Sequence, residues 1–80
     1  MATTDWQQQD DALEREYEFP DFKAAMWFVN RVADLAEERN HHPDILVHGW
    51  NKVRLTLYTH TAGAITDADR EMADRIDRLP

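Results

Sequence analysis

The run Asn40-His41-His42-Pro43 constrains the fold more than any other stretch of the chain. Pro43 disfavours helical geometry at the residue before it, so a helix that reaches this run must end by His42. Upstream, apolar side chains recur at helical spacing from an N-cap at Asp21 to about Arg39. They form one broad stripe, of the width expected for a helix packed on a sheet: Phe22, Ala25, Met26, Phe28, Val29, Val32, Ala33, Leu35 and Ala36.

Three stretches around this helix are expected to be strands, and the first and third of them alternate between apolar and polar residues with period two. The first runs from Leu13 to Phe19 and has an acidic outer face. The second, from Ile45 to Trp50, and the third, from Val53 to His60, lie close enough in sequence to pair as a hairpin, with Gly49 as a turn or bulge residue. His60 falls on the polar side of the third strand.

A second helix is expected from about Asp67 to Leu79, with Thr66 as its N-cap and Asp69 at the capping-box position. Asp69 also falls inside the apolar stripe of this helix, which otherwise holds Ala68, Met72, Ala73, Ile76 and Leu79. The carboxylate either caps its own helix or pairs with a residue from elsewhere, because a buried carboxylate without a partner is costly. Together these elements predict an α+β fold: a small antiparallel sheet with two helices packed on one face, in the order β-α-β-β-α.

The chain has 80 residues, enough for one small domain with a marginal core. We expect residues 1–12 to form a polar segment that is partly disordered, and residues 13–80 to form the domain. The formal net charge of −7 opposes binding to nucleic acid or to anionic membrane surfaces. We expect a cytoplasmic protein, because the first residues do not resemble a signal peptide and no apolar run is long enough to span a membrane.

The supply of reactive side chains narrows the chemistry. The chain has no cysteine, no serine and two glycines, which argues against nucleophilic catalysis and against a phosphate-binding loop. Its four histidines lack the spacing of a zinc site, so we expect no metal. General acid/base catalysis without a cofactor remains, with His41, His42 and His60 as candidates and Glu37 and Asp69 as carboxylates that could orient the rings. The alternative is that His41 and His42 lie at the end of a helix and have no catalytic role.

The spacing of these candidates resembles a known signature. The pattern Glu37-x3-His41-His42-Pro43-x6-Trp50-x9-His60-x8-Asp69 is similar to that of the pterin-4a-carbinolamine dehydratases. The similarity covers about Leu13 to Leu79 and includes Phe19-x-Asp21-Phe22, Phe28-Val29-Asn30-Arg31-Val32, Asn51-Lys52-Val53 and Thr59-His60.

This resemblance implies a dehydration in which a 4a-hydroxytetrahydropterin loses water to give the quinonoid dihydropterin, so that the pterin used by aromatic amino acid hydroxylases is recycled. It implies that His41 and His60 form the principal acid/base pair and that His42 assists them. The pterin is the substrate, and no cofactor is required. The substrate pocket that the resemblance implies is formed by His42, Pro43, Glu37, Trp50, Thr59 and Asp69.

The resemblance also implies an antiparallel sheet with helices on one face and assembly as a homodimer or homotetramer. Family members commonly carry a further amino-terminal helix where this chain has a dozen polar residues, which leaves the oligomeric state open. The alternative function is a non-catalytic protein-binding or dimerisation-cofactor module, since some animal relatives also act as a dimerisation cofactor for a transcription factor and other relatives have been linked to enzyme assembly. Trp27, on the charged face of the first helix, is either a subunit contact or an ordinary exposed tryptophan.

Overall fold

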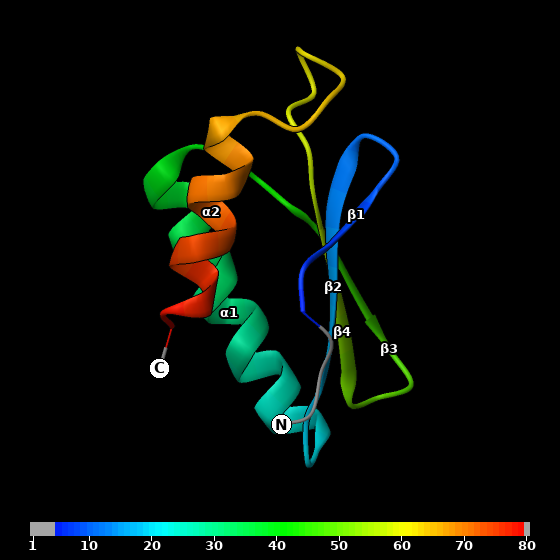
Figure 1. The fold of residues 1–80 in the computed structure, drawn as a ribbon. Helices are drawn as coiled ribbons and strands as arrows, with labels where there is room; N and C mark the ends of the chain where they lie inside the picture. The colour runs from blue at the N-terminus through cyan, green and yellow to red at the C-terminus, as the bar shows by residue number, and fades with distance from the viewer. Residues whose placement is uncertain (1–4, 80) are drawn as a thin grey trace.

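The structure, a computed structural model, describes residues 5–79 as a four-stranded antiparallel sheet with two helices on one side of it (Figure 1). The order of strands across the sheet is β1-β2-β4-β3. The elements along the chain are β1 (Gln7–Gln9), β2 (Ala12–Glu18), α1 (Phe22–Arg39), β3 (Asp44–His48), β4 (Lys52–Leu57) and α2 (Asp67–Asp77). The predicted α+β class, the antiparallel sheet and the single helical layer are confirmed.

One strand was not predicted. β1 lies within the polar segment of residues 1–12 and pairs with β2, so that Gln7 lies opposite Glu14. Trp6, next to this strand, is tied to the end of α2, because Trp6 Nε1 donates to Asp77 Oδ1 at 2.9 Å. The order of elements is therefore β-β-α-β-β-α, and Gln7–Gln9 and Ala12 of this segment belong to the sheet. Residues 1–4 lie outside the described part.

The core forms between the inner face of the sheet and the helices. Val53, Leu55 and Leu57 on β4 are fully buried, as their alternation predicts. On α1 the buried residues are Ala25, Phe28, Val32 and Ala36, a narrower set than the predicted stripe. Phe22 and Ala33 are exposed, because Phe22 starts the helix before its first buried turn and Ala33 lies about 100° around the helix axis from Val32.

The two ends of α1 are capped by side-chain and backbone geometry. Asp21 accepts a hydrogen bond from the backbone N–H of Ala24 at 2.7 Å, which confirms the predicted N-cap. At the other end, Asn40 adopts a left-handed conformation with φ of 52°, and the N–H of His41 donates to Ala36 O at 3.1 Å. This is the Schellman pattern of a helix end. The helix therefore ends at Arg39, as predicted, but Asn40 and not Pro43 turns the chain.

Candidate active site

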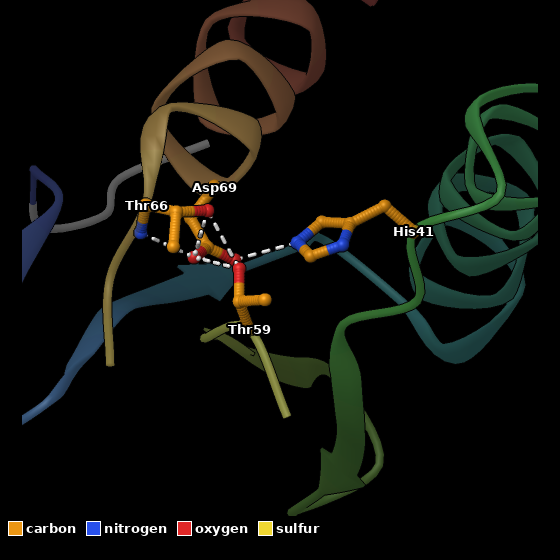
Figure 2. Close-up of polar contacts among 4 residues, drawn as sticks. All are labelled: His41, Thr59, Thr66 and Asp69. Carbon is orange, nitrogen blue, oxygen red and sulfur yellow. Dashed lines mark hydrogen bonds and ion pairs between the residues drawn. The ribbon is translucent and has the colours of Figure 1, made fainter. Parts of the chain in front are cut away.

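The candidate site lies where the end of α1 meets the first turn of α2. The Schellman turn fixes the backbone of His41, and its ring reaches across to α2 (Figure 2). His41 Nε2 lies 2.6 Å from Asp69 Oδ1, although the two residues are 28 positions apart in the chain. The Asp69 side chain is fully buried and the His41 side chain is 19% exposed, so one end of this pair is closed to solvent and the other is accessible.

Asp69 both caps its own helix and pairs with a distant residue, so the two interpretations left open by the sequence are both correct. Its Oδ2 accepts from the backbone N–H of Thr66 at 2.9 Å and from Thr59 Oγ1 at 2.8 Å. Burial is the largest single influence and acts to raise the pKa of Asp69, but hydrogen bonds from Thr66, His41 and Thr59 outweigh it and lower that pKa below 3.8. The carboxylate is ionised at neutral pH.

His42 and Glu37 form a second pair on the outside of the same corner. His42 Nε2 contacts Glu37 Oε2, and both side chains are more than half exposed. Glu37 therefore leans toward the corner, and its partner is the second histidine. Pro43 follows as a half-buried residue that leads the chain into β3.

His60 does not lie on a strand. β4 ends at Leu57, and the chain then forms a loop that Thr59 closes through an isolated bridge to Ala64. The His60 ring packs on Tyr58, with ring centroids 4.4 Å apart. Within residues 5–79 no hydrogen bond joins His60 to His41, although Thr59, the residue before it, contacts Asp69 directly. The predicted strand end is wrong, and the loop brings His60 to the same end of the sheet as the corner.

Trp50 lies apart from the other predicted site residues. It sits in the turn between β3 and β4, where Gly49 and Trp50 both have φ of 56°, and its side chain is 62% exposed. β3 leads from the His41 corner to this turn over five residues, a span of roughly 16 Å. Figure 1 shows this turn at the end of the β3–β4 hairpin opposite the loop that follows β4. Within one chain the structure does not bring Trp50 to the corner.

A cavity of about 440 Å³ opens beside His41, between the end of α1 and the start of α2. This volume lies in the range of sites for small organic molecules. An ion pair between Arg39 and Glu71 joins the two helices at the cavity. The cavity is lined by Glu38, Arg39, His41, Asp67, Ala68, Glu71 and Met72. Sequence reasoning did not single out Asp67 or Glu71, whose place on the exposed side of α2 is that of ordinary surface charges.

The fourth histidine lies outside the site. His48 is on the face of the sheet that the helices leave uncovered, where it contacts Glu16, which also accepts from Arg54 Nε at 3.0 Å. Across residues 5–79 no three histidine or carboxylate groups are placed to hold a metal ion together. In the same part of the chain neither helix has the length and apolar character needed to cross a membrane.

Comparison with known proteins identifies the family. The model of the family described as pterin 4 alpha carbinolamine dehydratase matches residues 1–79. The chain belongs to the pterin-4a-carbinolamine dehydratase family. The predicted resemblance is confirmed, and the chain is classed with the hydro-lyases, enzymes that remove water from their substrates.

Relatives from different organisms carry the name of this dehydratase. A protein of Thermomicrobium roseum is 53% identical over 74 residues, which is 92% of this chain and 78% of the relative. A protein of Sulfurisphaera tokodaii is 45% identical over the same shares of the two chains. Among the solved structures, a transcriptional coactivator/pterin dehydratase from Brucella melitensis superposes with a TM-score of 0.85 at 34% identity, covering 94% of this chain and 81% of that one.

A second pterin dehydratase neighbour carries a different description. A pterin dehydratase-like protein, described as a RuBisCO assembly factor in the alpha-carboxysome, superposes with a TM-score of 0.76 at 28% identity. The match covers 92% of this chain and 87% of that protein. The dehydratase fold is thus found in neighbours with catalytic and with assembly descriptions.

Proposed function

We propose that this chain dehydrates a 4a-hydroxytetrahydropterin to the quinonoid dihydropterin. One basic group takes the proton from N5, and one acidic group protonates the hydroxyl at C4a, which leaves as water while the C4a=N5 double bond forms. His41 and His60 act as this acid/base pair, and His42 assists them. No cofactor takes part, because the reaction moves protons only and leaves the oxidation state of the pterin unchanged.

The observation that carries the proposal is the contact between His41 and the buried, ionised Asp69 at the edge of a cavity. A carboxylate hydrogen-bonded to an imidazole orients the ring and stabilises the imidazolium that forms during proton transfer. The cavity supplies room for a small heterocycle next to that ring. Pro43 and Glu37 lie at or next to the corner and are proposed as pocket residues, although the cavity beside His41 is lined by neither of them. Thr59 and Asp69 stand behind the His41 ring and are proposed to support it.

The test compares single alanine variants of three histidines. His41→Ala and His60→Ala are each expected to reduce the dehydration rate of a chemically generated 4a-hydroxytetrahydropterin by about 10²-fold or more, because each removes one proton-transfer group. His48→Ala is the matched control, since His48 lies on the uncovered face of the sheet, and it is expected to keep the wild-type rate. Near-wild-type rates in both His41→Ala and His60→Ala would contradict the proposal.

Trp50 has a place in this proposal only through another subunit. The side chain is too far from the corner of its own chain to touch the same pterin, and we propose it as a pocket residue only if a second copy presents it. Trp50→Ala, measured for KM and for oligomeric state together, separates these cases. An unchanged KM in an intact oligomer would remove Trp50 from the site.

The second candidate function is a protein-binding or dimerisation-cofactor module. It is supported by the descriptions of the two structural neighbours and by Trp27, which is 48% exposed with the Arg31 guanidinium 4.8 Å above its ring. Addition of a reduced pterin analogue separates the two functions. A higher melting temperature at saturating analogue supports the dehydratase, and an unchanged one supports the module.

We propose a homodimer or homotetramer, supported by the exposed apolar side chains Phe22, Trp27, Leu46 and Trp50 on a chain with a small core. Sedimentation of the protein across a concentration series tests this. A role beside an aromatic amino acid hydroxylase, the absence of nucleic-acid and membrane partners, and a cytoplasmic location stay predictions.

A further inference from the structure

Two threonine hydroxyls stand behind the carboxylate that holds His41. Thr59 Oγ1 lies 2.8 Å from Asp69 Oδ2 and 2.7 Å from Thr66 Oγ1. Thr59 comes from the loop after β4, whereas Thr66 and Asp69 belong to the start of α2 (Figure 2). The network therefore ties this loop to the helix at the point where the helix meets His41.

The direction of every hydrogen bond in this network follows from the charge on Asp69. An ionised carboxylate only accepts, so Thr59 donates its single hydroxyl hydrogen to Asp69 Oδ2. Thr66 must then donate its hydroxyl hydrogen to Thr59 Oγ1. On the other oxygen, His41 Nε2 must carry a hydrogen to approach Asp69 Oδ1 at 2.6 Å. His41 Nε2, the Thr59 hydroxyl and the Thr66 N–H donate to the carboxylate directly, and the Thr66 hydroxyl supports Thr59.

This arrangement assigns the two nitrogens of His41 different tasks. Nε2 keeps its hydrogen in both the neutral and the protonated ring, so Nδ1 is the nitrogen that gains or loses a proton. Nδ1 has no hydrogen-bond partner within residues 5–79, and it is not one of the fully buried side-chain nitrogens of that part of the chain. It is the ring atom left for a substrate.

We propose that Thr59 and Thr66 are positioning residues that, through Asp69, hold His41 in the Nε2–H tautomer and present Nδ1 as its proton-exchanging atom. This inference rests on the proposed dehydration and adds the tautomer and its supports to it. Thr59 then acts without touching the pterin, because its hydrogen is already donated to Asp69. Thr66 keeps Thr59 in that orientation by donating to its oxygen.

The experiment combines kinetics with ¹⁵N NMR of the histidine rings in the unliganded, full-length protein. In the wild type, the neutral ring of His41 is expected to show the Nε2–H pattern. Thr59→Val removes the hydroxyl at nearly constant shape and is expected to populate the Nδ1–H tautomer and to lower kcat about tenfold with little change in KM, because one hydrogen bond to a charged group is lost. Thr59→Ser keeps the hydroxyl and is expected to restore most of kcat.

Two further variants serve as control and as a second arm. Thr56→Val makes the same change on the uncovered face of β4 and is expected to leave kcat and the His41 signals unchanged. Thr66→Val removes the outer donor and is expected to act in the same direction as Thr59→Val, with a smaller effect. If Thr59→Val does not fold, Thr66→Val and Thr59→Ser still report on the network.

Several outcomes would overturn the inference. These are an Nδ1–H pattern in the wild type, an unchanged tautomer in both valine variants, or a rise in KM at constant kcat, which would mean that Thr59 contacts the substrate. The NMR result does not depend on turnover. A wild-type protein that shows the Nε2–H pattern but no dehydration would therefore contradict the proposed function and leave the tautomer assignment supported.

Discussion

Replacing Asp69 by asparagine tests how much the fold depends on one buried charge. The carboxylate accepts hydrogen bonds from Thr66 N, Thr59 Oγ1 and His41 Nε2, and its side chain is fully buried. An asparagine of the same shape can accept only through Oδ1, and its NH₂ group must face at least one of these donors. The variant therefore loses charge-assisted bonds and, unless the His41 ring changes tautomer so that Nε2 accepts from the NH₂ group, leaves a buried donor without an acceptor.

The cost can be worked out from these contacts. A hydrogen bond to a charged group contributes about 1.5–3 kcal/mol, and a buried donor left without a partner costs about 1–3 kcal/mol. We expect Asp69→Asn to lower the free energy of unfolding at pH 7 by about 3 kcal/mol, a large share of the stability of a small domain. Urea denaturation followed by tryptophan fluorescence and circular dichroism measures this loss.

The dependence on pH provides the sharper test. Because the pKa of Asp69 is lower in the folded than in the unfolded state, its contribution is complete above the unfolded value near 3.8 and is lost as the pH falls through the folded value. The stability gap between wild type and Asp69→Asn should be present at pH 7 and shrink as the pH falls below 3.8. Asp74→Asn, an exposed change on the same helix, should cost less than about 0.5 kcal/mol. Equal stability of wild type and Asp69→Asn at pH 7 would refute the reasoning.

Two further predictions concern other parts of the fold. Burial, the largest influence, raises the pKa of Tyr17 to about 12. The unfolded tyrosine therefore ionises first, and the wild type should lose about 2–3 kcal/mol of stability between pH 10 and pH 12. In urea titrations Tyr17→Phe should remove this loss, and an unchanged loss in alkali would contradict the assignment. At the end of α1, Asn40→Gly should be at least about 1 kcal/mol more stable than Asn40→Ala in thermal unfolding, because alanine is strained at φ of 52°; equal melting temperatures would count against this.

The strongly periodic elements could be predicted from the sequence because their patterns reflect burial directly. The alternation of Val53, Leu55 and Leu57 and the presence of Asp69 in an apolar stripe each indicated a real feature of the packed structure. The capping signals at Asp21 and Thr66 gave the starts of both helices, since a cap depends only on neighbouring residues.

Features that depend on distant partners could not be predicted in this way. The three glutamines of β1 carry no alternation, and they form a strand because β2 offers an edge to pair with. The loop position of His60 depends on the bridge between Thr59 and Ala64, which leaves no periodic signal. The separation of Trp50 from the corner could have been predicted, because a strand that starts beside His41 places its other end far from His41.

Asp69 serves a helix end and a histidine at once, so the two are thermodynamically coupled. A ligand that binds His41 more tightly when Asp69 holds the ring also makes the first turn of α2 harder to open, and by the same free energy, because such linkage is reciprocal. The amides of Asp69 and Arg70, which bond to Thr66 O, should then exchange with deuterium more slowly when the pocket is filled. Occupancy of the pocket and local opening of α2 are two measures of one equilibrium.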